Sequence, residues 1–286
     1  MTIAHMGAVN ADQIAYWNGS AGRRWTDRQE LQDALLAPVS EALFARTKVE
    51  RGERVIDIGC GCGSTTIELA RRVGPTGHVV GVDVSVPMLA RARERALPGM
   101  PIEFVEADAT VYRFPRGLAD LLCSRFGVMF FADPASSFAN LRGALRSGGR
   151  LVFACWREPQ ANPWMALPLR EVYKHVPDLP ESGPEDPGPF AFAQADRVRR
   201  ILDQAGFSAI ALVPVDLAID LAAWRGLDAA VATALEIGPA SRALDGQPAE
   251  LRESAARSIR AALAPFQQGD TVPLAAAIWI VTANNR

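Results

Sequence analysis

The chain has 286 residues, of which 49% are hydrophobic and 22% are charged, and its formal net charge is −2. This composition is typical of a folded globular chain with enough apolar side chains for a sizeable core. The balanced charge, without a basic block, argues against a nucleic-acid partner, and the absence of a long apolar run argues against a membrane span.

The cysteines and the first residues indicate a compartment. The chain starts MTIAHMGAVNADQ, which has neither the charged nor the apolar region of a secretory signal. We therefore expect a cytoplasmic protein with reduced thiols. The Cys60-x-Cys62 pair could indicate a metal site, but no second pair and no nearby histidine completes one. We expect no metal and interpret both cysteines as small, buried loop residues.

Residues 1–50 are expected to form an N-terminal helical cap. Apolar residues recur there at helical spacing, namely Leu31, Leu35, Leu36, Val39, Leu43 and Phe44. Aromatic residues, including Trp17 and Trp25, come before this stretch. They either pack the first helix onto the core or act as a lid over a site.

Between residues 51 and 156, β-branched runs alternate with helical runs. The pattern predicts strands at 54–58, 77–83, 102–108, 119–125 and 150–156. Ser85 is placed to cap one helix, and Asp133 another that Gly148 and Gly149 end. Strands alternating with helices imply parallel pairing through right-handed crossovers. The expected fold class is an α/β doubly wound sheet.

Residues 157–286 are expected to form a substrate-side half of the same compact domain. Eight prolines break the pattern over 157–193, and interleaved aromatic residues favour an ordered cover over the site. Residues 220–268 are interpreted as inserted helices, which are candidates for a homodimer surface or for further pocket wall. The segment LAAAIWIVTA predicts the last strand.

A glycine-rich loop, Asp57-x-Gly59-x-Gly61-x-Gly63, follows the first predicted strand and precedes a helix. Glycines let the backbone turn tightly and approach a ligand closely, so this context predicts a nucleotide site. The dinucleotide fingerprint would need a glycine at the position of Ser64. An NAD(P) oxidoreductase is therefore a weaker alternative.

The run VIDIGCGCG resembles motif I of the class I S-adenosylmethionine (SAM)-dependent methyltransferases. The resemblance implies that Asp57 lies near the amino-acid end of SAM and that the glycines at 59, 61 and 63 pass under its carboxylate and sulfonium. It also implies a Rossmann-like sheet of seven mostly parallel strands, with an antiparallel last strand and added helices.

Two further segments carry the resemblance over roughly residues 50–155. GVDVSVPML is similar to the second motif of the family, which implies that Asp83 binds the ribose hydroxyls and that Met88 lies against the adenine. FVEADAT is similar to the third, which implies that Asp108 and Ala109 meet the adenine edge. The remaining candidates for binding SAM are Trp25, Val84, Ser124, Arg125 and Phe126.

Arg125 stands at the carboxyl end of a predicted strand, where open α/β sheets bind their ligands. It is a candidate to bind the SAM carboxylate or an acidic acceptor. The alternative is that it braces the fold by pairing with a nearby acid.

The segments SRFGVMFFADP, GGRLVFACW and NPW are similar to the UbiE-like branch of ubiquinone and menaquinone biosynthesis methyltransferases. This implies direct displacement of the methyl group from SAM to a small, aromatic or apolar acceptor, which leaves S-adenosylhomocysteine (SAH). The candidates for contacting the acceptor are Trp17, Met129, Trp156, Asn162 and Trp164. The runner-up function is a SAM-binding sensor or scaffold without turnover.

A general base is needed only if the proton of the acceptor must leave early. His5 falls in a predicted tail, and His78 opens a strand at the end away from the cofactor. His175 is the one candidate base, and its alternative is a solvated helix histidine.

Overall fold

The computed structural model describes residues 10–177, 183 and 185–286, and it contains one sheet of seven strands in the order β3-β2-β1-β4-β5-β7-β6. The strands are β1 (Arg54–Ile58), β2 (His78–Asp83), β3 (Ile102–Glu106), β4 (Ala119–Arg125), β5 (Leu145–Trp156), β6 (Ser208–Asp220) and β7 (Pro273–Asn284). β1 to β5 pair in parallel, and β7 runs antiparallel between β5 and β6. The predicted doubly wound Rossmann-like sheet with an antiparallel last strand is confirmed.

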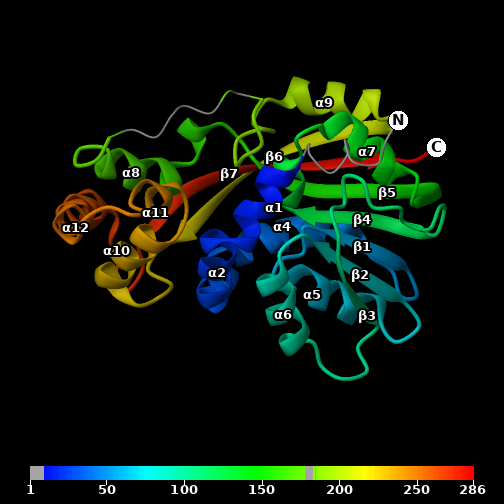
Figure 1. Ribbon diagram of the computed structural model, residues 1–286, viewed down its shortest axis with the longest axis horizontal. Helices are drawn as coiled ribbons and strands as arrows, with labels where there is room; N and C mark the ends of the chain where they lie inside the picture. Colours follow the sequence, from blue (N-terminus) through cyan, green and yellow to red (C-terminus); the bar gives the residue numbers. More distant parts are fainter. Residues whose placement is uncertain (1–9, 178–182, 184) are drawn as a thin grey trace.

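The central strands are apolar on both faces because helices cover both. Val55, Ile58, Leu121 and Leu122 are almost completely buried, as expected for parallel strands enclosed between layers. α5 (Ser64–Val73) and α6 (Val86–Arg95) lie beside β1–β3, and α7 (Pro134–Arg142) and α9 (Ala195–Gln204) lie beside β5–β7 (Figure 1). β1 precedes α5 and β2 precedes α6, and the two strands are adjacent and parallel, so their carboxyl ends lie at the same edge of the sheet.

The N-terminal stretch forms four short helices rather than one continuous helix. They are α1 (Ala11–Asn18), α2 (Ser20–Asp27), α3 (Gln29–Leu35) and α4 (Ala37–Thr47). α4 buries Val39 and Leu43 against the sheet. In Figure 1, α1 and α2 lie between the sheet and a group of later helices.

That later group stands at the end of the molecule away from β3 (Figure 1). It comprises α8 (Pro163–Val172), α10 (Gly226–Glu236), α11 (Pro239–Ala243) and α12 (Ala249–Leu263), with the 3₁₀ turns η3 (Pro159–Ala161) and η4 (Ala264–Phe266). Another 3₁₀ turn, η2 (Gly127–Phe130), follows β4. Among the described residues, no helix combines the length and the apolar character that crossing a membrane would take.

Two predicted boundaries were wrong. The helix after Asp133 ends at Arg142, and β5 begins at Leu145, because Gly148 (φ +74°) is accommodated within a strand instead of ending a helix. β3 ends at Glu106, because the carbonyl of Asp108 already accepts turn hydrogen bonds from the amides of Val111 and Tyr112. The consequence for the site is that Asp108 lies on a turn rather than on a strand.

Candidate functional site

The loop between β1 and α5 is shaped by glycines. Gly59, Gly61 and Gly63 all have positive φ angles, of 66°, 54° and 80°. A Cβ atom on Gly61 would lie 2.7 Å from the Cε atom of Met88, so the loop and α6 are in direct contact. A side chain at this point would displace Met88 and change the shape of the loop.

Asp57 lies underneath this loop and is completely buried. Its Oδ2 atom accepts hydrogen bonds of 2.6 Å from the hydroxyls of both Thr65 and Thr66, at the start of α5. Its Oδ1 atom is buried and has no hydrogen-bond partner in the described ranges. Burial raises the pKa of Asp57 to about 6, against the lowering effect of the two hydroxyls and of Arg125. Asp57 therefore joins the loop to α5 and keeps one acceptor oxygen unpaired.

Asp83 ends β2 with its carboxylate turned toward the same loop. Its Oδ2 atom accepts from the amide of Gly61 and its Oδ1 atom from the amide of Ser85, both at 2.8 Å. Burial raises the pKa of Asp83, and these backbone hydrogen bonds oppose the rise. Because each carboxylate oxygen can accept two hydrogen bonds, a lone pair on each stays available. A diol such as ribose could donate to both.

Asp108 and Ala109 form a turn after β3. The Oδ1 atom of Asp108 accepts from the amide and the hydroxyl of Thr110, and also from the side-chain amide of Asn10, at 3.1 Å. Ala109 is buried. The expected adenine end of the site is thus covered by the residue that precedes α1.

A cavity of about 40 Å³ lies between the loop and the N-terminal helices. It is lined by Trp25, Asp33, Gly59, Cys60, Gly61, Cys62, Ser64, Thr65, Met88, Arg125 and Phe126. One buried water needs about 10–15 Å³ of such a cavity, so this cavity has room for about three waters. Trp25 of α2 and Asp33 of α3 are among the lining residues, so the N-terminal helices form one wall of the cavity.

Arg125 at the end of β4 is the cation of this cavity. Its guanidinium donates to the hydroxyl of Ser40 at 2.7 Å and lies 4.0 Å from the carboxylate of Asp33 in α3. Burial lowers the pKa of Arg125, and Asp33 and Asp57 oppose the fall. The carboxylate of Asp33 also accepts a hydrogen bond of 2.5 Å from Arg95. Arg95 donates another to the carbonyl of Cys62 and so connects Asp33 to the loop.

Asp33 was not among the cofactor-binding residues predicted from the sequence. It lies in an amphipathic stretch where a polar residue is the rule, so its place in the chain does not separate it from its neighbours. Together, Asp33 and Arg125 offer one negative and one positive group to the same cavity. This pair suits the zwitterionic amino-acid end of SAM, as the free lone pairs of Asp83 suit its ribose.

Several other residues expected to bind SAM have structural contacts instead of lining the cavity. The hydroxyl of Ser124 donates to the carbonyl of Ile58 at 2.8 Å and so ties β4 to β1. A Cβ atom on Gly63 would lie 3.0 Å from Ala92, so this glycine lets α5 start close to α6. The carbonyl of Val84 accepts from the side chain of Asn18.

The cysteines of the loop are buried and unpaired. Burial raises the pKa of the Cys62 thiol to about 11 and that of Cys60 well above its usual value of 9.0. Both thiols are therefore protonated near neutral pH. Among the described residues, no three or more His, Cys, Asp or Glu side chains form a group that could hold a metal ion.

The aromatic candidates for contacting the acceptor form two clusters. Trp17 in α1 makes edge contacts with Trp25 and with Phe130, at centroid distances of 6.0 and 5.1 Å. Trp156, at the end of β5, stacks on Phe126 at 4.2 Å, and Trp164 lies 5.2 Å from Trp156. The second cluster starts at the cofactor cavity, because Phe126 lines it.

The two remaining candidates, Asn162 and Met129, are less favourably placed. The amide of Asn162 donates to the carbonyls of Arg157, Glu158 and Ala277 and accepts from the amide of Ala277. Its amide hydrogens are taken up by the backbone and the residue is completely buried, so we do not keep it in the proposed pocket. Met129 lies within η2 and is buried.

The candidate base lies away from the cavity. The Nε2 atom of His175 is 2.7 Å from the hydroxyl of Ser258 in α12, and His175 is not among the residues that line the cavity. His78 opens β2 and faces Glu103 in β3, as expected for a residue at the far end of the sheet. His5 lies outside the described residues. The geometry therefore does not favour the weak prediction of a base at His175.

Comparisons with known proteins agree with this geometry. Residues 55–149 match the family described as "Methyltransferase domain". The demethylmenaquinone methyltransferase of Thermus thermophilus is 31% identical over 198 residues, which cover 63% of this chain and 88% of that protein. The ubiquinone/menaquinone biosynthesis C-methyltransferase UbiE of Erwinia tasmaniensis is 29% identical over 160 residues, which cover 54% of this chain and 63% of that one.

Solved structures share the fold. The crystal structure of the YcgJ protein from Bacillus subtilis superposes with a TM-score of 0.57 and 17% sequence identity, covering 87% of this chain and 99% of that chain. At this level of identity the likeness concerns the fold alone.

Proposed function

The chain belongs to the class I SAM-dependent methyltransferases, in their UbiE-like branch, and from this premise we propose that it methylates a flat, apolar small molecule. Its cofactor is SAM and it transfers the methyl group to a small-molecule acceptor. A sensor without turnover and an NAD(P) oxidoreductase are not favoured by these relationships. The finer part of the proposal is the chemical character of the acceptor.

The observation that carries the proposal is the aromatic series Phe126–Trp156–Trp164. Phe126 has a positive φ of 73°, which turns it at the end of β4, where it lines the cofactor cavity. Trp156 stacks on it with an interplanar angle of 16°, and Trp164 continues the series at 52°. Offset stacked rings favour flat, apolar partners. A flat acceptor beside Phe126 would therefore meet a wall of similar chemistry.

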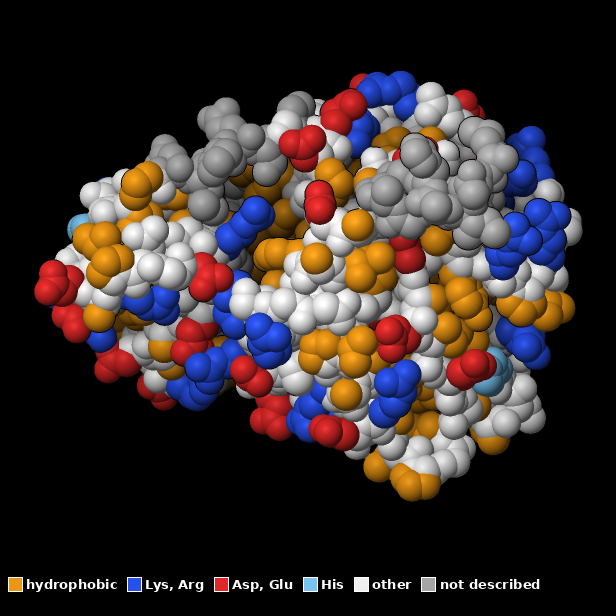
Figure 2. All heavy atoms as spheres, in the orientation of Figure 1, with side chains coloured by type: hydrophobic (Ala, Val, Ile, Leu, Met, Phe, Trp, Pro, Cys, Tyr) orange, Lys and Arg blue, Asp and Glu red, His pale blue; other side chains and the backbone are white. Residues whose placement is uncertain are grey.

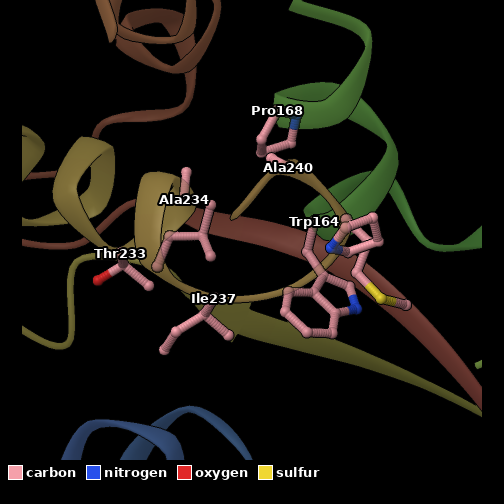
Figure 3. Close-up of a pocket in the computed structure, with 9 residues that line it drawn as sticks. Trp164, Pro168, Thr233, Ala234, Ile237 and Ala240 are labelled. Atoms are coloured by element: carbon pink, nitrogen blue, oxygen red, sulfur yellow. The ribbon is translucent and has the colours of Figure 1, made fainter. Parts of the chain in front are cut away.

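Trp164 also lines an apolar recess of about 10 Å³ on its other side (Figure 3). Figure 3 shows Trp164 and Pro168 of α8 facing Ala234 and Ile237, with Ala240 of α11 closing the recess. The hydroxyl of Thr233 points away from Trp164 in this view. The lining of the recess is thus mostly apolar, and the Nε1 atom of Trp164 is a buried donor without a partner among the described residues.

The face shown in Figure 2 has a hollow lined by hydrophobic side chains, between the positions that α11 and α1 occupy in Figure 1. Charged contacts join the two sides of this region. Arg24 pairs with Asp245, and Arg28 pairs with Glu236, so α2 and the turn after it are tied to the helices around α11. An apolar opening with charged edges is suited to an acceptor that enters from solvent.

The bound cofactor supplies a methyl group on a positively charged sulfur, which an acceptor nucleophile takes in one displacement. The residues of this chain then need only to hold the two reactants in line and to keep water out. We assign the amino-acid end of SAM to Asp33 and Arg125, the ribose to Asp83, and the adenine to Asp108, Ala109 and Met88. Phe126 and Trp156 orient the acceptor.

Two further predictions, on location and on oligomeric state, stay proposals. A cytoplasmic location rests on the four cysteines, all of which are buried and unpaired. A homodimer rests on Trp224, whose side chain is 78% exposed in the turn between β6 and α10. Sedimentation of the protein and of Trp224→Ala would test it, since a dimer that uses this side chain should become monomeric in the variant.

The proposal is tested with methyl-labelled SAM and two acceptors of opposite chemistry. One is a naphthohydroquinone with a short prenyl chain, and the other is phosphoethanolamine. We expect the label in the hydroquinone, with one SAH formed for each methyl transferred. Label only in phosphoethanolamine, or no SAH with either acceptor, would overturn the proposal.

Variants locate the acceptor in the same assay. Trp156→Ala removes a stacked ring, and a loss of roughly 1.4 kcal/mol, or about tenfold in kcat/KM, is expected. SAH affinity should change little, because Trp156 does not line the cofactor cavity. Phe266→Ala is the control, since it removes an exposed aromatic side chain that lines neither the cofactor cavity nor the recess beside Trp164.

A further inference from the structure

Helix α1 is attached at both of its ends to the segments that we assign to the adenosine of SAM. At its start, the side-chain amide of Asn10 donates to the Oδ1 atom of Asp108 at 3.1 Å. At its end, Asn18 contacts the loop that follows Asp83. α1 therefore spans from the adenine end of the site to the ribose end.

The two attachments differ in strength. Asn18 donates to the carbonyl of Val84 at 2.8 Å and accepts from the amide of Val86 at 2.9 Å. The hydroxyl of Ser85 adds a bond of 2.7 Å to the carbonyl of Trp17. Ser85 holds the N-cap position of α6, yet its side chain makes no capping bond there. The end of α1 is thus fixed by three hydrogen bonds to the loop that carries Asp83.

The start of α1 is less well satisfied. Asn10 is only 7% exposed, and its Oδ1 atom is buried without a hydrogen-bond partner among the described residues. Its side chain does not cap the helix either. Leaving a buried acceptor unpaired is unfavourable, so this contact with Asp108 can be exchanged for a better one.

Adenine offers such a replacement. Its amino group is a donor, as the amide nitrogen of Asn10 is, and ring nitrogens beside it accept hydrogen bonds. The contact between Asn10 and Asp108 therefore supplies to the carboxylate the same kind of donor that the adenine amino group would. While Asn10 donates to Asp108, the adenine amino group cannot donate along the same direction to that oxygen.

We propose that Asn10 holds the place of the adenine amino group at Asp108, and that α1 swings out about its Asn18 anchor when SAM displaces it. Asn18 is then a positioning residue, which holds the loop of Asp83 in the open and the closed arrangement alike. The proposal rests on the assignment of the adenosine to Asp83 and Asp108.

Binding of SAH, measured by calorimetry and by stopped-flow fluorescence, tests it. Asn10→Ala should bind SAH about two- to tenfold more tightly than the unmodified protein, mainly through faster association, because no hydrogen bond has to be displaced. If Asn10→Ala folds poorly, Asn10→Ser replaces it in the test. Its side chain is too short to reach Asp108, so it should show the same gain in SAH affinity. Asp12→Ala, at an exposed position on the same helix, is the control and should change nothing.

Asn18→Ala should act in the opposite direction and weaken SAH binding severalfold, since the loop of Asp83 loses its support.

Amide hydrogen exchange along α1 is a second test of the proposal. With SAH bound, the amide of Ile14, which donates to the carbonyl of Asn10, should exchange faster, while the Asn18 end keeps its protection. Slower exchange along the whole of α1 would overturn the proposal.

Failure of this proposal can be told apart from failure of the cofactor assignment. If the unmodified protein binds SAH and Asn10→Ala and Asn10→Ser bind it equally or less well, the role of Asn10 is refuted and the cofactor assignment stands. If the unmodified protein does not bind SAH, both are refuted.

Discussion

Gly59 and Gly127 meet backbone to backbone where the loop after β1 passes the end of β4. A Cβ atom on Gly59 would lie 2.6 Å from the Cα atom of Gly127, and one on Gly127 would lie 2.7 Å from the Cα atom of Gly59. The two segments can approach this closely only because neither residue has a side chain. The contact sets the position of the loop against Arg125 and Phe126, which line the same cavity.

The first prediction concerns this contact. Gly59→Ala should lower the free energy of unfolding by more than the roughly 1–2 kcal/mol that a left-handed backbone costs a residue with a side chain. It should also weaken SAH binding at least about tenfold, a loss of about 1.4 kcal/mol. Urea unfolding and calorimetry measure the two effects.

Gly99→Ala isolates the backbone contribution. Gly99 has a φ of +81° and no atom within 4 Å of a built Cβ, so this variant carries the strain without the collision. Its SAH affinity should stay unchanged. Equal losses of stability in the two variants would show that the contact between Gly59 and Gly127 contributes nothing.

A second prediction concerns Asp33. Asp33→Asn removes the negative charge that faces the amino-acid end of SAM, so SAH should bind about tenfold more weakly, as for a hydrogen bond to a charged group. 5′-Methylthioadenosine, which lacks that end, should bind about as well as before. Calorimetry with both ligands makes the comparison.

Glu30→Gln is the control for the loss of a charge on the same helix. Its side chain is 90% exposed and lies 4.0 Å from Arg91. It should affect neither ligand. A loss of affinity in Asp33→Asn that is equal for SAH and methylthioadenosine would mean that Asp33 supports the loop through Arg95 and does not face the cofactor.

A third prediction follows from the pKa of Asp57, which burial raises from 3.8 to about 6. The folded protein then binds more protons than the unfolded chain between about pH 4 and pH 6, so stability falls as the pH rises through this window. The full cost above it is about 3 kcal/mol. Urea unfolding of the protein and of Asp57→Asn at several pH values should show the unmodified protein losing stability relative to the variant as the pH rises.

Asp120 should behave in the opposite way. Its partial burial raises the pKa, but the amide of Arg54 and the guanidinium of Arg146 outweigh this and leave the pKa lowered. Its contribution to stability is therefore present at neutral pH and is lost as the pH falls below about 4.

For Asp57, a difference in the free energy of unfolding between Asp57→Asn and the unmodified protein that stays constant across pH 4–8 would contradict the raised pKa.

A fourth prediction concerns the recess beside Trp164. Within the part of the chain that the structure describes, the hydroxyl of Thr233 is buried without a hydrogen-bond partner. Thr233→Val, which keeps the shape, should therefore raise the free energy of unfolding by about 1 kcal/mol. Thr66→Val should lower it, because that hydroxyl donates to Asp57 at 2.6 Å. Thermal unfolding of both variants gives the signs, and a destabilised Thr233→Val would show that the hydroxyl has a partner.

The sequence predicted the cofactor half well for a physical reason. Local patterns, namely β-branched runs and glycines at strand ends, determine where parallel strands end and where ligands approach. Gly59, Gly61 and Met88 line the cavity, and their contact with SAM stays a prediction. Asp33 could not be found in this way, because it reaches the cavity through the packing of α3 against α2 and α4, which no local pattern encodes.

The acceptor half was harder to predict for the same reason. Asn162 follows β5, as an acceptor residue would, but the backbone of β7 takes up its amide. Trp156 and Trp164 were singled out as aromatic residues, and only the tertiary structure shows that they continue a series from Phe126. Roles that depend on contacts between distant segments need the structure.

The most direct test of the central claim is calorimetric titration of the unmodified protein with SAH and, separately, with NAD. The account predicts one SAH bound per chain, no NAD binding, and SAH affinity at least about tenfold lower in Asp83→Ala, a loss of about 1.4 kcal/mol. NAD binding without SAH binding, or unchanged SAH affinity in Asp83→Ala, would contradict it.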